Sequence, residues 1–134
     1  MPSYEKISSQ IPKSIKHMFP DPKEGKKKAG AKMHKKIAIT YVLWIIEKEP
    51  MTGYQLMKKL KEDHQESLSK PSRIYPFLVN LEKQGLLRSR ILKKGKRESK
   101  QYTITPKGKL VITTTRKILS QMLWGEFLQD ISRR

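Results

Sequence analysis

The stretch from Ser69 to Leu86, SKPSRIYPFLVNLEKQGL, most constrains the fold, because it predicts one short helix with two unlike faces. Large apolar residues recur at spacings of three, four and seven, as in a core-facing stripe: Ile74, Phe77, Leu78 and Leu81. Small, polar or basic residues occupy the opposite side, with Arg73 and Tyr75 on the flanks: Ser72, Pro76, Asn80 and Lys83. Ser69 or Ser72 is the expected N-cap, and Gly85 ends the helix. An ordinary amphipathic surface helix has the same pattern.

The net charge of the chain indicates which class of partner the polar face of this helix binds. A helix that packs on one side and offers small, polar and basic groups on the other fits a DNA major groove. The 134 residues carry a formal net charge of +18, which favours a polyanionic partner. The absence of cysteine excludes a disulfide scaffold and thiolate metal sites. With no recognisable signal peptide and no apolar run longer than ten residues, we expect a cytoplasmic, nucleoid-associated protein without a membrane span.

The chain before this helix divides into an arm and two further helices. Residues 1–32 are basic and rich in proline, and we expect a flexible arm there. The helical spacing of Ile7, Ile11 and Ile15 leaves a short docked helix as the alternative. From about Met33 to Glu49 the pattern predicts a helix that is apolar nearly all round, which favours cover by a second subunit.

A start signal for the next helix follows Pro50. Thr52 and Gln55 have the spacing of a capping box, and the helix should continue to about His64. After Gly85 the apolar period changes to two, and Lys93-Lys94-Gly95-Lys96-Arg97 separates the two extended runs. This pattern predicts a hairpin with a basic tip. From Arg88 to Lys100, seven Lys or Arg face one Glu, a net charge of +6 by 7 − 1.

The last predicted element is a helix that begins with Thr105 as N-cap and Pro106 at its first position. Its apolar stripe is wider than a monomer needs, so we expect a homodimer interface formed by Ile118, Leu119, Met122, Leu123, Phe127 and Leu128. The expected fold class is mainly α with a two-stranded β-wing. It comprises an arm at 1–32, a winged helix-turn-helix domain at 33–105 and a long C-terminal dimerisation helix at 106–134.

Three segments resemble the PadR-like transcriptional regulators. Pro50-Met51-Thr52-Gly53-Tyr54-Gln55-Leu56 is similar to the family's P-x-x-G-Y-E-L, with Gln55 in place of the usual acid. The run from Ile74 to Leu86 is similar to L-Y-P-x-L-x-x-L-E-x-x-G-L, and the run from Lys100 to Gly108 is similar to K-x-Y-x-L-T-x-x-G. The start Lys70-Pro71-Ser72-Arg73 departs from the family pattern, which leaves its base contacts open.

The resemblance implies a homodimeric DNA-binding regulator, with repression as the expected role. In some relatives a flat ligand binds at the dimer interface, and Trp124 with Phe127 could line such a pocket for a small aromatic effector; packing in a core is the alternative. The expected operator is pseudo-palindromic, with the helix at 72–84 in the major groove and the wing at 93–97 on the backbone. The candidate DNA-binding residues are Ser72, Arg73, Tyr75, Asn80, Lys83, Lys93, Lys94, Lys96 and Arg97. Arg73 could contact either a base or a phosphate. Tyr75 could either donate its hydroxyl to a phosphate or pack against the wing.

The sequence carries no recognisable catalytic motif. The sequence contains no phosphate-binding glycine loop, no H-E-x-x-H and no cysteine nucleophile, so we expect no enzyme, metal site or cofactor. The competing function is an architectural or chromatin-type protein that coats DNA with little sequence specificity, which high positive charge also supports.

Overall fold

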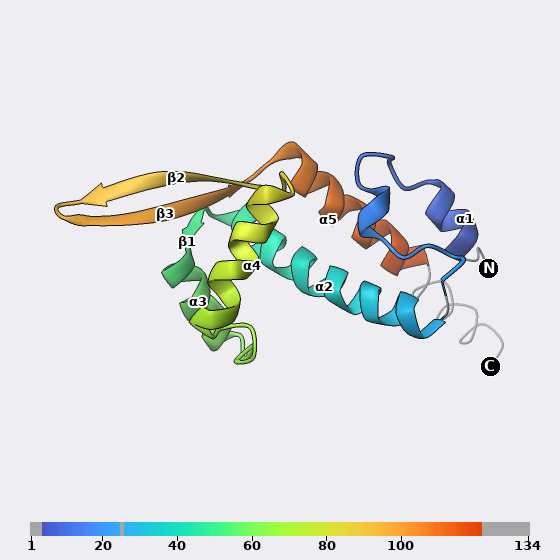
Figure 1. Ribbon diagram of the computed structural model, residues 1–134, viewed down its shortest axis with the longest axis horizontal. Coiled ribbons are helices and arrows are strands. Elements are labelled where there is room, and N and C mark those ends of the chain that lie inside the picture. Colours follow the sequence, from blue (N-terminus) through green and yellow to red (C-terminus); the bar gives the residue numbers. More distant parts are fainter. Residues whose placement is uncertain (1–3, 25, 122–134) are drawn as a thin grey trace. The chain divides into compact units, whose positions relative to one another are not determined.

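The computed structural model describes residues 4–24 and 26–121, which fall into two compact units. One unit consists of the described parts of Met1–Tyr41 and Leu110–Arg134, and the other is Val42–Lys109. The second unit carries two complete helices and the β-sheet, and Figure 1 shows how these elements follow one another along the chain. The expected boundaries at residues 32 and 105 do not coincide with the division between the units.

Three helices supply most of the apolar side chains that the second unit buries. They are α2 (Lys26–Lys48), whose residues from Val42 onward belong to this unit, α3 (Gly53–Glu62) and α4 (Pro71–Lys83). The capping box of α3 forms as expected, because Thr52 Oγ1 accepts from Gln55 N and Gln55 Oε1 accepts from Thr52 N. The fully buried core side chains include Leu43, Ile46, Leu56, Leu60, Ile74, Leu78, Leu81, Leu86 and Leu87.

The start of α4 differs from both expected N-caps. Lys70 is the N-cap and makes no side-chain capping hydrogen bond, and Pro71 occupies the first turn. Proline is favoured there because its fixed φ suits the helix and its missing N–H has no intrahelical partner. The serine hydroxyls do not cap α4, and Ser69 Oγ instead donates to Glu66 O at 2.8 Å. The helix ends as expected, with Gly85 at a φ of +79° directly after the C-cap Gln84.

The predicted hairpin belongs to a three-stranded antiparallel sheet of order β1-β3-β2. Its strands are β1 (Met51–Thr52), β2 (Leu87–Lys94) and β3 (Arg97–Ile104). Pairing of Met51 with Tyr102 adds the short β1, which is not predicted from the sequence. Gly95 and Lys96 connect β2 to β3, and the φ of +61° at Gly95 suits a two-residue hairpin turn. Figure 1 shows β2 and β3 as a long ribbon extending away from α3 and α4.

A single hydroxyl joins the end of α4 to the start of α5 (Pro106–Leu119). Thr105 Oγ1 donates to Gly85 O at 2.6 Å and accepts from Gly108 N at 3.1 Å. The second bond makes Thr105 the N-cap of α5, as its position before Pro106 predicts. Gly108 lies so close to Leu86 O that a Cβ would overlap that carbonyl oxygen.

The first unit buries a set of apolar side chains from its N-terminal segment. This segment holds α1 (Tyr4–Ser9) and the short 3-10 helix η1 (Lys16–Met18). Ile7, Ile11, Ile15, Met18 and Phe19 are all buried. Residues 4–24 are therefore folded, as in the alternative of a short docked helix, and do not form the expected flexible arm.

Basic and polar groups accompany this core of the first unit. Tyr4 Oη donates to Pro20 O at 2.7 Å, and Thr40 Oγ1 donates to Thr115 Oγ1 of α5 at 3.0 Å. Lys36 is only 6% exposed, with its Nζ 5.8 Å from the centroid of the Phe19 ring. Burial, followed by the charges of Lys32 and Lys35, lowers the pKa of Lys36 to about 8.

Two of the expected dimer-interface residues lie within the described part of the chain. Ile118 is 1% exposed within its own unit, so its side chain is already covered by the same chain. Leu119 is partly exposed. Met122, Leu123, Phe127 and Leu128 lie outside the described residues, as do Trp124 and the pocket predicted from it.

Candidate nucleic-acid interface

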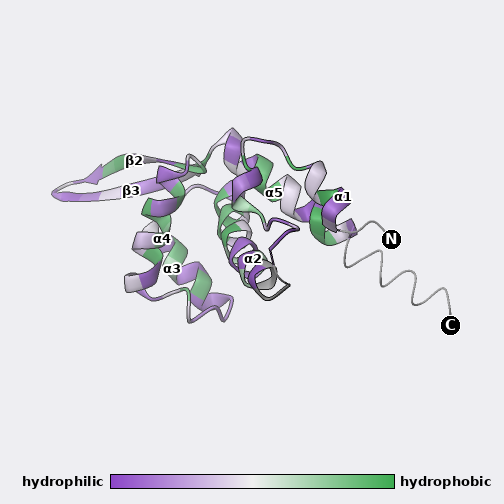
Figure 2. Cartoon of the chain, turned by 45° about the vertical axis from the view of Figure 1, so that its right-hand side comes forward, coloured by the Kyte–Doolittle hydropathy of each residue, from purple (hydrophilic) through white to green (hydrophobic). Residues whose placement is uncertain are grey.

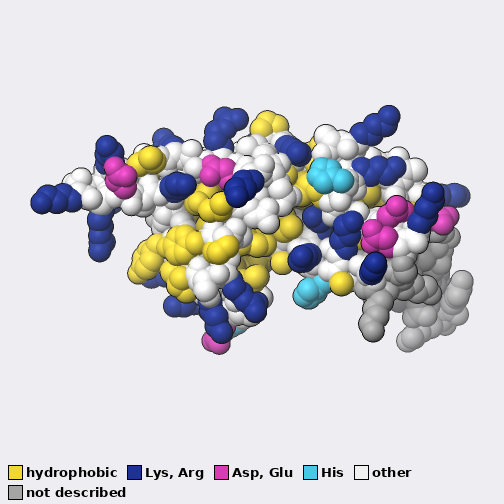
Figure 3. Space-filling view, in the orientation of Figure 1, with side chains coloured by type: hydrophobic (Ala, Val, Ile, Leu, Met, Phe, Trp, Pro, Cys, Tyr) yellow, Lys and Arg dark blue, Asp and Glu magenta, His cyan; other side chains and the backbone are white. Residues whose placement is uncertain are grey.

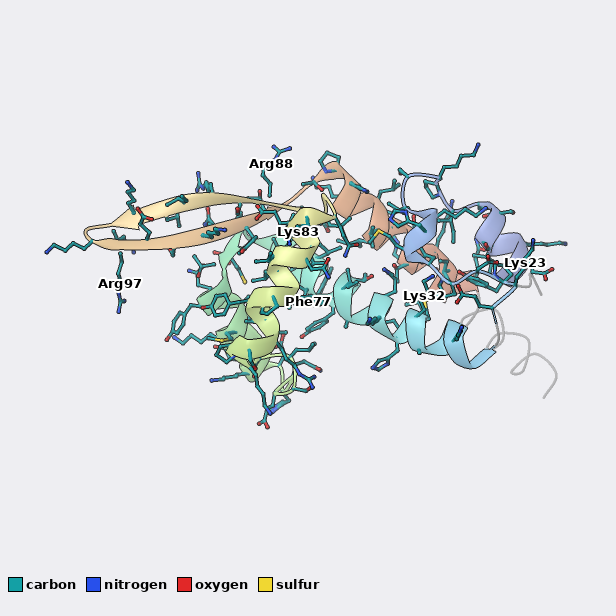
Figure 4. All side chains as sticks on the ribbon, viewed as in Figure 1. Lys23, Lys32, Phe77, Lys83, Arg88 and Arg97 are labelled. Atoms are coloured by element: carbon teal, nitrogen blue, oxygen red, sulfur yellow. The ribbon has the colours of Figure 1, made fainter. Side chains whose placement is uncertain are left out.

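The outward face of α4 is a stripe of four exposed residues on the side opposite the core. At about 100° per residue, positions 72, 76, 79 and 83 fall within a narrow sector of the helix. Ser72, Pro76, Val79 and Lys83 are exposed there, while Ile74, Leu78 and Leu81 are buried on the other side. Three of the four were expected on this face from the sequence; Val79, which is 40% exposed, was not. Figure 4 labels Lys83 near the C-terminal end of this helix.

Two polar residues beside the stripe make hydrogen bonds within the protein. The Arg73 guanidinium donates from Nη1 to Ser67 Oγ at 2.9 Å, which attaches this side chain to the loop before α4. Asn80 Oδ1 accepts from Gln84 Nε2 at 2.7 Å. Both side chains are exposed and retain further donors, because a guanidinium has five N–H groups and a carboxamide has two. They can therefore contact a ligand from restrained positions.

Tyr75 lies between α3 and the wing. An ideal Cβ at Gly53 would come within 2.6 Å of Tyr75 Cε1, so the ring packs directly on the glycine backbone. Tyr75, Tyr54, Lys100 and Tyr102 contribute to the lining of a hollow of about 260 Å³. Tyr75 remains 45% exposed and Tyr54 62% exposed. The Tyr75 ring can therefore pack towards the wing while the residue stays exposed enough to donate its hydroxyl to a phosphate.

Glu82 connects α4 to the hairpin through a hydrogen bond. Its Oε2 accepts from Ser89 N of β2 at 2.8 Å. Ser89 pairs with Tyr102 in the β2–β3 ladder, so this carboxylate lies beside the buried tyrosine. Burial, then the charge of Glu82 and the neighbouring Tyr75, raise the pKa of Tyr102. The orientation of α4 and the root of the wing are therefore linked through one carboxylate.

The basic tip of the hairpin is exposed, as the sequence predicts. All four residues of the tip lie at the surface: Lys93, Lys94, Lys96 and Arg97. Figure 3 shows Lys and Arg side chains projecting around the end of the hairpin. Among the described residues, Lys93 is the one of these four with an ion-pair partner, Glu98 at 3.6 Å, and both side chains are more than half exposed. Such a surface pair contributes little stability, so the tip remains strongly positive. Figure 2 shows the hydrophilic character of the turn.

Strand register divides the hairpin charge unequally between its two faces. Residues that pair across the ladder share a face, and residues alternate between faces along a strand. The face opposite the buried Leu87 and Tyr102 carries four basic residues and no acid, a charge of +4 by 4 − 0: Arg88, Arg90, Lys94 and Arg97. The other face carries Lys93, Lys100 and Glu98, or +1 by 2 − 1.

Two arginines of the wing were missed as candidate site residues. Arg88 and Arg90 are exposed on the more basic face, and the alternation of charge along β2 was the signal for them. Arg90 Nε donates to Gln101 Oε1 at 2.8 Å across the ladder. Figure 4 shows Arg88 extending away from α4 and Arg97 projecting near the turn. The basic surface of the wing thus runs along the stem as well as over the tip.

Neither a metal centre nor a membrane span is found in the described residues. Over residues 4–24 and 26–121, no three His, Asp or Glu side chains come together in a group that could hold a metal ion. None of the helices in that part of the chain is both long and apolar enough to cross a bilayer.

The arrangement defines a winged helix. Helices α3 and α4, the β2–β3 hairpin and the small sheet place an exposed helix face and a basic ribbon in one compact unit. This is the architecture with which winged helix-turn-helix proteins bind DNA. The chain belongs to the transcriptional regulator PadR-like family, whose family model matches residues 42–114.

Solved structures of PadR regulators have the same fold. A PadR-like transcriptional regulator from Bacillus cereus is 23% identical with a TM-score of 0.58, and the match covers 76% of this chain and 97% of that chain. A PadR family transcriptional regulator from Eggerthella lenta is 26% identical with a TM-score of 0.54, covering 80% and 88%. One from Clostridium difficile is 24% identical with a TM-score of 0.55, covering 69% and 97%. A search of the curated proteins found no significant match.

Proposed function

We propose that the chain is a homodimeric transcriptional repressor that reads a pseudo-palindromic DNA operator. In this proposal each protomer inserts α4 into the major groove and lays the β2–β3 hairpin on the adjoining backbone or minor groove. The two half-sites lie about one helical turn apart, roughly 34 Å. Ser72 and Arg73, at the start of α4, contact bases or the phosphates next to them. The observation that carries the proposal is the exposed stripe of α4 followed directly by a basic ribbon.

Charge and exposure suggest how the two elements divide affinity and specificity between them. The hairpin residues from 87 to 104 have a net charge of +6 by 7 − 1, and their basic side chains are exposed. Phosphate contacts of this kind supply affinity and register but no sequence information. Sequence must then be read by α4, whose outward face carries hydroxyl, apolar and basic groups, with the Asn80 amide beside it. Membership of a family of regulators does not favour the architectural, DNA-coating alternative.

Self-association is supported by apolar surface on α2. Ile37 is 44% exposed and Trp44 is 42% exposed, and their spacing of seven places them on one side of the helix. Resemblance to the PadR-like regulators also implies a DNA-binding homodimer. In the proposed dimer, Leu119 and the predicted interface residues from Met122 onward pack against the partner. The effector pocket at Trp124 and Phe127 stays part of the proposal.

A selection of bound sequences from a random DNA pool at near-physiological salt tests this function. The expected outcome is a two-fold symmetric motif, bound about 10³-fold or more tightly than unrelated DNA. Light scattering on the same preparation should give twice the chain mass of 15.7 kDa. Tight, steeply salt-dependent binding without an enriched motif would overturn the regulator in favour of the architectural protein.

A pair of variants separates the site from overall charge. Arg73→Ala should weaken binding to the selected motif, whereas Lys13→Ala removes the same charge from an exposed position in the N-terminal segment. If both variants lose equal affinity, net charge alone drives binding and α4 is not the recognition element.

A further inference from the structure

The centre of the outward stripe of α4 is apolar. Ser72 and Lys83 occupy its two ends, and Pro76 and Val79 lie between them. Proline and valine side chains have no hydrogen-bond donor or acceptor. The middle of this stripe therefore has no side-chain group that can read base edges by hydrogen bonding.

We propose that Pro76 and Val79 read thymine methyl groups in the major groove, which places thymines at the centre of each half-site. The C5 methyl of thymine is the apolar group that the four base pairs offer on the major-groove edge. An exposed apolar pair facing a groove without such a methyl would displace water and gain no compensating contact. This inference rests on the proposed function, because it assumes that α4 enters the groove.

The side chains around the pair support DNA as the occupant of this surface. Arg73 and Lys83 flank it on α4, and the neighbouring hairpin adds its net charge of +6. A protein partner would need an acidic rim around an apolar centre, whereas duplex DNA presents two phosphate backbones around a groove floor that carries methyl groups. The hydrogen bonds of Arg73 to Ser67 and of Asn80 to Gln84 hold the polar flanks beside the apolar centre.

Deoxyuridine substitution tests the inference at the level of one methyl group. Deoxyuridine keeps the base pairing and O4 acceptor of thymine and lacks only the methyl. Each thymine of the selected operator is replaced in turn, and the dissociation constant is measured by fluorescence anisotropy. Removing a methyl that Pro76 or Val79 contacts should weaken binding about fourfold. Replacements outside the half-sites serve as the DNA control.

A Val79→Ala variant completes a double-mutant cycle. It should bind the parent operator more weakly and show little further loss at the thymine that Val79 contacts. Ile91→Ala is the matched control, since Ile91 is an apolar side chain that is 60% exposed on β2 and is not part of α4. That variant should keep the full deoxyuridine penalty. Circular dichroism melting establishes that both variants are folded.

The possible results distinguish this inference from the function on which it rests. An enriched motif whose affinity is insensitive to every deoxyuridine substitution would leave the regulator standing and overturn the reading of thymine methyls. A Val79→Ala variant that retains the whole penalty at each thymine would overturn it equally. If no motif is enriched at all, the proposed function itself fails, and the inference fails with it.

Discussion

Replacing Thr105 by valine removes the hydroxyl that joins α4, the hairpin exit and α5 while keeping the size of the side chain. Thr105 is 9% exposed, its Oγ1 donates to Gly85 O at 2.6 Å, and the same oxygen accepts from the buried Gly108 N at 3.1 Å. Valine can make neither bond. Because the shapes match, the substitution leaves no cavity, and its cost comes from the two unpaired backbone groups.

The expected loss of stability follows from these two groups. Loss of a threonine N-cap costs about 1–2 kcal/mol, and leaving the Gly85 carbonyl without its partner costs about 1 kcal/mol more. The sum, about 2–3 kcal/mol, should lower the melting temperature by roughly 6–15 °C in a chain of this size. Thr105→Ser is the control. It keeps the hydroxyl and loses one methyl group, at about 1 kcal/mol.

Thermal and urea denaturation monitored by circular dichroism, at equal protein concentration, measure both variants. Thr105→Val should be clearly less stable than Thr105→Ser. If the valine variant unfolds within about 0.5 kcal/mol of the parent protein, or if serine is as harmful as valine, the hydroxyl does not hold this junction and the reasoning fails.

Three further predictions concern the wing, its attachment and the buried lysine. Lys96→Ala should reduce the slope of log affinity against log salt by about one unit, for related and unrelated DNA alike, in a salt titration by gel shift; an unchanged slope would remove Lys96 from the phosphate contacts. Glu82→Ala should lower the free energy of unfolding by about 1–3 kcal/mol because Ser89 N loses a charged acceptor, whereas Glu82→Gln keeps an acceptor oxygen and should lose less in urea denaturation; equal losses would contradict the role of that bond. The pKa of Lys36 falls from 10.5 to about 8 on folding, so the unfolded chain binds the extra proton between these values, and stability should rise from about pH 8 to 10.5. Lys36→Met should abolish that rise in melting temperature, and persistence of the rise would assign it to other groups.

Local features of the fold could be predicted because they depend on neighbouring residues. The capping box of Thr52 and Gln55 needs only a spacing of three, and it forms as expected. The buried stripe of α4 follows from helical periodicity, and Gly85 has the positive φ that a helix-ending glycine supplies. The exposed basic turn at Gly95 follows from strand periodicity interrupted by glycine and charge.

Features that depend on distant partners were missed from the sequence or left as an alternative. Pairing of Met51 with Tyr102 created β1 from a two-residue segment too short to show a period. The N-terminal segment was expected to be an arm because prolines and lysines dominate its composition. Its isoleucines Ile7, Ile11 and Ile15 are nevertheless buried. Burial of that kind depends on what the rest of the unit presents, which composition does not reveal.

The sequence by itself determined the winged-helix architecture, the basic tip of the wing and most of the exposed face of α4, because periodicity, caps, turns and charge are properties of short segments. Only the tertiary structure decided how the candidate side chains are held. It placed Tyr75 on Gly53, attached Arg73 to Ser67 and joined Glu82 to the backbone of Ser89. Such contacts require side chains to meet in three dimensions, and the geometry of that meeting is set by the packing of α3, α4 and the sheet.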